Sequence, residues 1–124
     1  MQIKAVNHVA LHVADVAESV AFYGQVLDLE PMPRPAFDFP GAWFRIGADQ
    51  ELHLIGDRTE AVRSHSRGTH FALHVPDVEA AGRELSQKGV PFSGPKTRPD
   101  GILQIFLQDP DGHYIELCEV REEV

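Results

Sequence analysis

Hydrophobic and polar residues alternate near the start of the chain, as they do in a β-strand with one buried face. The pattern covers residues 6–13. One face of this predicted strand carries Val9, Leu11 and Val13, and the other carries His8, Ala10 and His12.

The spacing of the apolar residues then changes from every second residue to the three or four residues typical of a helix. Asp15 suits the N-cap position. Gly24 and the segment 31–35, which holds three prolines, weaken and end the helix. The apolar residues at helical spacing are Val16, Val20, Tyr23 and Leu27.

Three short strands are expected in the rest of the first half, at residues 30–32, 42–46 and 51–55. The last two are separated by a turn at residues 47–50. Residues 57–68 are polar and lack a strand pattern, which is typical of a linker.

The second half repeats this order. A strand is predicted at residues 69–75 and a helix from Asp77 toward Lys88, ended by Gly89. A weak strand follows at residues 90–92. Residues 101–108 and 113–120 then form a hairpin across a turn at residues 109–112, which contains proline and glycine.

The two halves also share a short sequence motif. Residues 8–16 read HVALHVADV and residues 70–78 read HFALHVPDV, so seven of nine positions match at an offset of 62. A repeat of this period indicates a duplicated supersecondary unit. His8 and His70 therefore occupy equivalent positions, where a symmetric set of ligands can be built.

Size and charge narrow the function. The chain has 124 residues and suits one domain, with a first module at about residues 1–57, a linker at about 58–68 and a second module at about 69–124. The formal net charge of −8 argues against a nucleic-acid partner. The sequence lacks a membrane span or secretory signal pattern, and its single cysteine, Cys118, excludes an intrachain disulfide, so a cytoplasmic protein is expected.

Four predicted strands each place one metal-competent side chain opposite bulky aliphatic residues. Three imidazoles and one carboxylate suit a divalent first-row metal such as Zn, Ni, Co, Mn or Fe(II) better than Ca or Mg. The four side chains are those of His8, His53, His70 and Glu116.

Several of these segments together resemble the vicinal oxygen chelate superfamily, and the resemblance covers essentially the whole chain. The superfamily includes glyoxalase I, fosfomycin-resistance proteins, methylmalonyl-CoA epimerase, extradiol dioxygenases and bleomycin-resistance proteins. The segments are NHVAL at residues 7–11, AFY at 21–23, LHLI at 52–55, THFA at 69–72 and DPDGHYIEL at 109–117.

The resemblance implies an α+β fold of two βαβββ modules whose strands form a curled mixed sheet, a cup-like partial barrel. It also implies a homodimer with sites at or near the dimer interface and one divalent metal per site. The implied ligands are His8, His53, His70 and Glu116, with Glu116 also moving protons. Position 53 departs from the family pattern, because glyoxalase I usually has Glu there and the epimerase Gln, so a contact of His53 with substrate is the alternative.

The implied function is that of a metal-dependent enzyme of glyoxalase or lyase type, in which the metal chelates a small oxygen-rich substrate and stabilises an enolate-like or oxyanionic intermediate. The alternatives are a metal-free protein that sequesters a small molecule, as bleomycin-resistance proteins do, and a dioxygenase or thiol transferase of the same superfamily. The further expectation is a set of substrate-binding residues: Trp43, Arg45, Arg98, Gln104 and Phe106. Tyr114 and Gln104 are candidates for supporting the ligands or for lining the cup. His12 and His74 are further candidates, but a structural role is favoured for these two.

Overall fold

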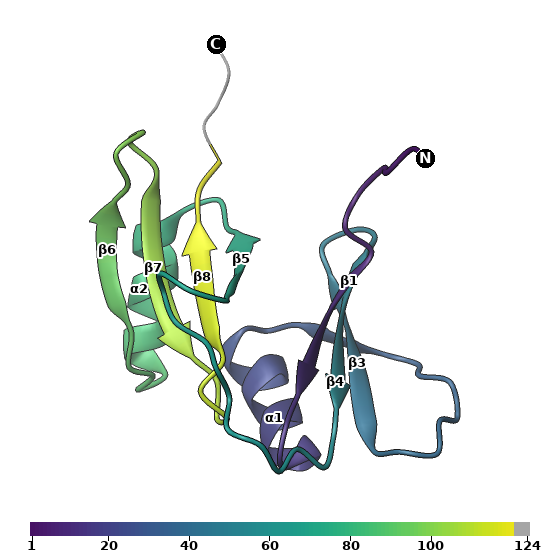
Figure 1. Ribbon diagram of the computed structural model, residues 1–124. Helices are drawn as coiled ribbons and strands as arrows, with labels where there is room; N and C mark the ends of the chain where they lie inside the picture. Colours follow the sequence, from purple (N-terminus) through teal and green to yellow (C-terminus); the bar gives the residue numbers. More distant parts are fainter. Residues whose placement is uncertain (121–124) are drawn as a thin grey trace. The chain divides into compact units, whose positions relative to one another are not determined.

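The chain folds into two compact units, Met1–Ala61 and Val62–Val124 (Figure 1). The computed structural model describes residues 1–120. Each unit has its own hydrogen-bonded sheet of four strands.

The first unit has the order β-α-β-β-β. Its strands β1 and β4 run parallel, and the β4–β3 and β3–β2 pairs are antiparallel, which gives the sheet order β1-β4-β3-β2. The elements are β1 (His8–His12), α1 (Val16–Ala21), a π-helical turn η1 (Phe22–Val26), β2 (Glu30–Met32), β3 (Gly41–Ile46) and β4 (Gln50–Ile55).

The second unit repeats this arrangement with the sheet order β5-β8-β7-β6, in which β5 and β8 are parallel and the other pairs antiparallel. The elements are β5 (Phe71–His74), α2 (Val78–Gln87), β6 (Ser93–Thr97), β7 (Leu103–Gln108) and β8 (Tyr114–Cys118). The predicted α+β fold of two βαβββ modules is therefore confirmed, with an open sheet in each unit.

Both α-helices have an aspartate as their N-cap residue. The Asp15 carboxylate accepts a hydrogen bond from the backbone N–H of Glu18, and Asp77 accepts one from Ala80. Each bond satisfies an amide group that has no partner within the helix. The repeated aspartate thus directs the chain from strand into helix at the same point of both units.

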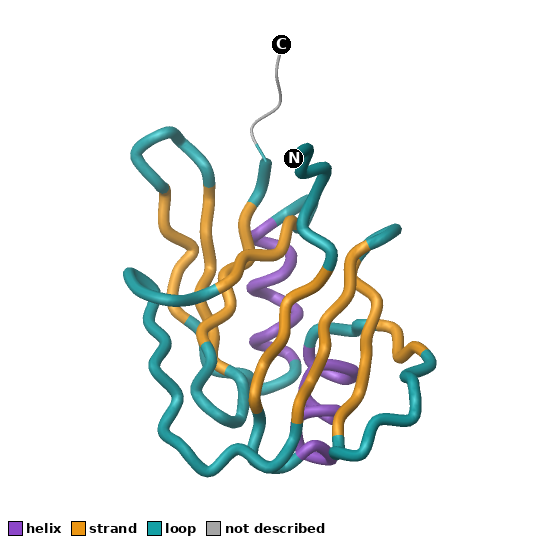
Figure 2. The backbone as a smooth tube through the Cα atoms, turned by 45° about the vertical axis from the view of Figure 1, so that its right-hand side comes forward, coloured by secondary structure: helices purple, strands orange, loops and turns teal. Residues whose placement is uncertain are grey.

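Each helix covers one face of the sheet in its own unit (Figure 2). In the first unit, the predicted apolar face of β1 is confirmed, and the sheet buries it together with side chains from β3 and β4. In the second unit, β7 and β8 supply most of the buried side chains. The core residues are Leu11, Val13, Tyr23, Phe44, Leu52 and Leu54 in the first unit and Val78, Leu85, Ile102, Ile105, Leu107, Ile115 and Leu117 in the second.

The strand predicted at residues 90–92 is wrong, because the structure places β6 at Ser93–Thr97. Gly94 and Pro95 argue against a strand at that position. The strand forms nonetheless, because β6 pairs on one side only and its ladder is irregular between Ser93 and Lys96, where a proline without an N–H is tolerated.

Two boundaries also differ from the predicted ones. His70 lies just before β5 rather than within it. The first α-helix ends at Ala21 and continues as one π-helical turn, which contains Gly24. Within residues 1–120, every helix is too short to cross a lipid bilayer.

Candidate metal centre

The first pair of predicted ligands lies on the polar face of the first sheet. Strand pairing aligns β1 with β4, and His53 points away from its neighbours Leu52 and Leu54, which are fully buried on the opposite face. The imidazole rings of His8 and His53 stack with their centroids 4.1 Å apart. Two strands far apart in sequence therefore bring these two histidines into contact.

One nitrogen of each ring is held by an oxygen atom. His8 Nδ1 lies 2.8 Å from the side-chain oxygen of Asn7, and His53 Nε2 lies 2.8 Å from a carboxylate oxygen of Glu51. Both oxygens accept hydrogen bonds, so both of these nitrogens carry the proton. The lone pairs that remain for a metal are on His8 Nε2 and His53 Nδ1.

The second pair lies in the second unit, where His70 precedes β5 and Glu116 lies in β8. The Glu116 side chain is buried, with only 6% of the residue exposed. His70 Nε2 is 3.0 Å from Glu116 Oε1, and Gln104 of β7 donates to the other carboxylate oxygen over 3.0 Å. The Phe106 ring meets His70 edge-on at 5.6 Å.

Both ring nitrogens of His70 face oxygen atoms that accept hydrogen bonds. Its Nδ1 faces the backbone carbonyl oxygen of Gly68 at 3.0 Å, so Nδ1 carries the proton of a neutral imidazole. The bare Nε2 then faces a carboxylate oxygen that also only accepts. A proton or a metal ion on Nε2 would satisfy this contact, and the nitrogen and oxygen donors fit a first-row divalent metal.

The structure thus gathers the four predicted ligands as two pairs, one in each unit. Within residues 1–120, no three His, Cys, Asp or Glu side chains form a single group that would hold a metal ion. Each pair by itself supplies two ligands.

Of the predicted substrate-binding residues, Trp43 lies flat on His53, with ring centroids 3.9 Å apart and planes 2° apart. Arg45 on β3 lies opposite Glu51 on β4 in the register of the two strands. Arg98 instead forms two hydrogen bonds with Asp100, which hold the pKa of that carboxyl at about 2 and raise the pKa of the guanidinium.

The residues predicted to support the ligands have different surroundings. Gln104 donates a hydrogen bond to Glu116, one of the predicted ligands. His12 Nε2 lies 3.0 Å from the carbonyl oxygen of Gly56, and Tyr114 packs against the ring of His65 at 5.4 Å. His74 is exposed on β5.

Sequence reasoning missed Glu51, the carboxylate that holds His53. Residues 51 and 53 are two apart on β4, so their side chains share a face. That spacing is the signal from which this contact was predictable.

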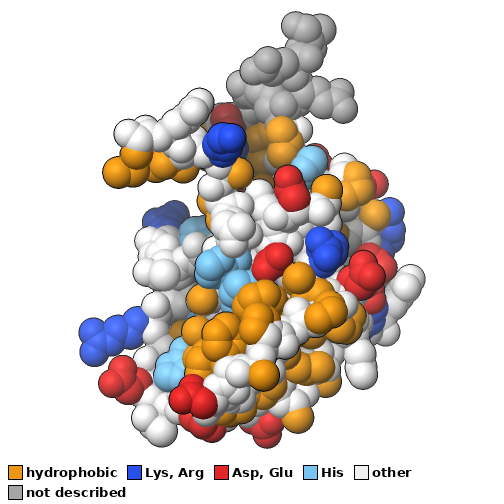
Figure 3. Space-filling view, turned by 90° about the vertical axis from the view of Figure 1, so that its right-hand side faces the viewer, with side chains coloured by type: hydrophobic (Ala, Val, Ile, Leu, Met, Phe, Trp, Pro, Cys, Tyr) orange, Lys and Arg blue, Asp and Glu red, His pale blue; other side chains and the backbone are white. Residues whose placement is uncertain are grey.

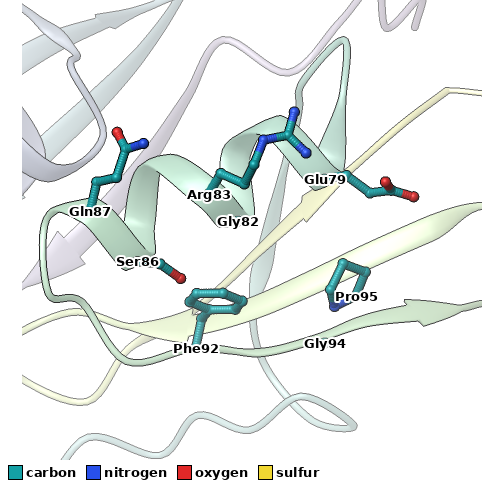
Figure 4. Close-up of a pocket in the computed structure, with 8 residues that line it drawn as sticks. All are labelled: Glu79, Gly82, Arg83, Ser86, Gln87, Phe92, Gly94 and Pro95. Atoms are coloured by element: carbon teal, nitrogen blue, oxygen red, sulfur yellow. The ribbon is translucent and has the colours of Figure 1, made fainter.

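A pocket of about 670 Å³ lies elsewhere in the second unit, between α2 and the first part of β6 with the residue before it, Phe92 (Figure 4). Phe92 and Pro95 face the helix, and Glu79 and Arg83 border the opening. None of the predicted site residues lines it.

Comparisons with known proteins agree with this fold. The chain is 27% identical to a protein named glyoxylase I 4 from Arabidopsis thaliana over 95% of this chain and 72% of that protein. It is 30% identical to a lactoylglutathione lyase from Salmonella typhimurium over 93% and 92% of the two chains. A crystal structure of a glyoxalase family protein from Bacillus anthracis superposes with a TM-score of 0.83 at 27% identity, over 98% of each chain. The family model described as the Glyoxalase/Bleomycin resistance protein/Dioxygenase superfamily matches residues 5–117, and the chain therefore belongs to this superfamily.

Proposed function

We propose that the protein is a metal-dependent enzyme of glyoxalase or lyase type, in which His8, His53, His70 and Glu116 bind one divalent metal ion. The observation that carries the proposal is the 3.0 Å contact between His70 Nε2 and the buried Glu116 carboxylate, which places a nitrogen and an oxygen donor side by side where they can bind a metal ion. The enzyme names of the relatives support the same reaction class.

The first unit supports the proposal through its two tethered histidines. Because Asn7 and Glu51 fix one nitrogen of each ring, His8 and His53 offer their remaining nitrogens without a change of tautomer. Fixing a ligand before the metal arrives lowers the entropy lost on binding.

A divalent metal at these residues would act as a Lewis acid, stabilising negative charge that develops on a substrate oxygen. Glu116 is the base of the proposed reaction. Its Oε2 accepts a hydrogen bond from the side-chain amide of Gln104, so the carboxylate keeps one orientation. Oε1, which contacts His70, is then the atom placed to hold or move a proton. The low exposure of Glu116 keeps water away from that oxygen.

Metal content measured by mass spectrometry tests the ligand set. Protein purified without chelator is expected to carry about one divalent ion per four-ligand site, and the variants His70→Ala and Glu116→Ala are expected to lose it. His74→Ala is the matched control, because His74 is an exposed histidine on β5, the strand that directly follows His70. Full metal content in both ligand variants would refute the assignment.

The reaction is tested by a substrate panel with protein reloaded separately with Ni, Zn, Mn and Fe(II). The panel holds a glutathione hemithioacetal, fosfomycin with a thiol, and a catechol, and so covers the lyase, transferase and dioxygenase alternatives. Turnover that disappears with chelator and returns with metal is expected for one of them. Tight binding of a small molecule without turnover, unchanged by chelator, would instead identify a sequestering protein.

A further inference from the structure

The segment between β2 and β3 exposes two aromatic rings beside Trp43. Phe37 and Phe39 are 47% and 38% exposed, and their ring centroids lie 5.0 Å apart. Phe37 also contacts Trp43, at 6.2 Å between centroids. We call these three residues the aromatic surface. Figure 3 faces this side of the first unit and shows hydrophobic side chains gathered over a broad area with histidine at its border.

Arg34 holds a positive charge against this surface. Its guanidinium carbon lies 4.8 Å from the Phe37 centroid and 4.9 Å from the Phe39 centroid, and its Nη2 donates to the Phe39 carbonyl oxygen over 2.9 Å. The contacts fix the guanidinium in place but use one of its five N–H donors. Pro33 and Pro35 flank Arg34 and restrict the backbone, which lowers the entropy cost of this arrangement.

Arg34 has no carboxylate partner within the part of the chain that the structure describes. Glu30 and Asp38 are the acidic residues nearest in sequence, each four positions away, and neither forms an ion pair with Arg34. An ordered guanidinium with free donors is suited to binding a carboxylate through two parallel hydrogen bonds. An arginine without an acidic partner among the described residues is notable in a chain whose formal net charge is −8.

The aromatic surface leads directly to a candidate metal ligand. Trp43 and His53 are cross-strand partners on β3 and β4, and their rings are parallel at 3.9 Å. A ligand resting on Phe37 is therefore connected to His53 through one ring, because Trp43 contacts both Phe37 and His53.

We propose that Arg34 and the aromatic surface form a binding site for a small molecule with a flat aromatic ring and a carboxylate, the ring resting on Phe37 and Phe39 and the carboxylate on Arg34. The identification of this molecule as the substrate of the metal centre rests on the function proposed above. A ring on the exposed phenylalanine surface gains stacking and buries apolar area. A carboxylate supplies the negatively charged partner that Arg34 lacks, whereas a second copy of this chain, with a net charge of −8, would be repelled by the first.

Trp43 makes the proposal measurable, because it is the single tryptophan of the chain and contacts Phe37. Its fluorescence is titrated in chelator-treated protein with three probes of equal length: 3-phenylpropanoate, 3-phenylpropan-1-ol and 3-cyclohexylpropanoate. We expect 3-phenylpropanoate to bind saturably, about tenfold more tightly than the alcohol and about fivefold more tightly than the cyclohexyl acid.

The variants separate the two parts of the site. Arg34→Gln is expected to remove the preference for the acid over the alcohol, and Phe37→Leu the preference for the aromatic over the cyclohexyl acid. Arg83→Gln is the matched control, since this exposed arginine lies on α2 in the second unit, and it is expected to bind all three probes as the parent protein does.

Three outcomes of the probe titrations would overturn the proposal: no saturable change with any probe, equal affinities for all three, or unchanged preferences in Arg34→Gln and Phe37→Leu protein with native circular dichroism. Sedimentation is measured in parallel, and a fluorescence change that accompanies dissociation of a dimer would assign the surface to a subunit contact and also overturn it. The titration uses no metal. Its failure is thus distinguishable from failure of the metal analysis, which tests the proposed function.

Discussion

Replacing Gln104 by Leu tests whether its amide holds the Glu116 carboxylate in the orientation that the candidate metal centre needs. Gln104 Nε2 donates to Glu116 Oε2 over 3.0 Å, and Glu116 is 6% exposed. Leu is close to Gln in size but has no donor. The substitution therefore leaves one oxygen of a buried carboxylate without this partner.

The expected loss of stability follows from the type of bond. A hydrogen bond to a charged group contributes about 1.5–3 kcal/mol, and the lower end applies because Gln104 is only half-buried and water can reach part of the gap. We therefore expect the free energy of unfolding of chelator-treated protein to fall by about 1.5 kcal/mol. For a domain of this size that corresponds to a melting temperature roughly 5 °C lower.

Metal binding supplies the second readout. A carboxylate that has lost its orienting partner binds metal less tightly, and we expect the dissociation constant to rise about tenfold or more. Urea unfolding and calorimetric metal titration measure the two effects.

Gln108→Leu is the matched control, because Gln108 lies on the same face of β7 and its side chain is exposed. Equal losses of stability in both variants, or an unchanged metal affinity in Gln104→Leu, would refute the reasoning.

Three further predictions concern the framework. Asp77→Ala removes the carboxylate that accepts the Ala80 amide at the start of α2, so the free energy of unfolding is expected to fall by about 1 kcal/mol; an unchanged urea midpoint would contradict this. Leu52→Ala empties a fully buried site and is expected to cost about 2–5 kcal/mol in the same assay, and a loss below about 1 kcal/mol would show that the sheet is not packed there as described. The Arg98 guanidinium lowers the Asp100 pKa from 3.8 to about 2, so the stabilisation by this pair is fully present above about pH 4 and is lost as the pH falls toward 2. An NMR titration of the Asp100 carboxyl carbon with a midpoint near 4, as expected for the Arg98→Gln variant, would refute this pairing in the parent protein.

The strand and helix order was predictable because each unit has a clear change of period. Residues 6–13 alternate, and the aspartate that caps the next helix is repeated 62 positions later, at Asp15 and Asp77. The location of β6 was not predictable in this way. Its sequence, SGPKT, has no apolar alternation, and all five residues are exposed, so backbone pairing with β7 alone defines the strand.

The candidate site was predictable to the level of faces but not of contacts. Alternation shows that His53 points away from Leu52 and Leu54, because the side-chain period of a strand is two residues. Which nitrogen is offered depends on the rotamer and on the partner that holds the other nitrogen, and Glu51 is such a partner. Arg98 shows the same limit, since its pairing with Asp100 depends on the geometry of a turn that the sequence does not specify.

The internal repeat extends to the way in which the equivalent histidines are held. His8 and His70 both have Nδ1 tied, the first to the side chain of Asn7 and the second to the backbone carbonyl of Gly68. In both units the repeat-related ring therefore offers Nε2, although the tether differs. This common tautomer follows from the position of each histidine at the start of a strand, where the preceding residues reach the near side of its ring.

The closing strands differ in residue type but keep the same charge. In the second unit the carboxylate of Glu116 is itself the proposed ligand, whereas in the first unit His53 is the proposed ligand and the Glu51 carboxylate lies 2.8 Å from its far nitrogen. Each unit therefore keeps one negative charge at its pair, in contact with an imidazole. In the proposed metal centre two such charges would balance a divalent cation, and the carboxylate behind His53 would make that imidazole a stronger donor. The histidine at position 53 is thus compatible with a metal centre through Glu51.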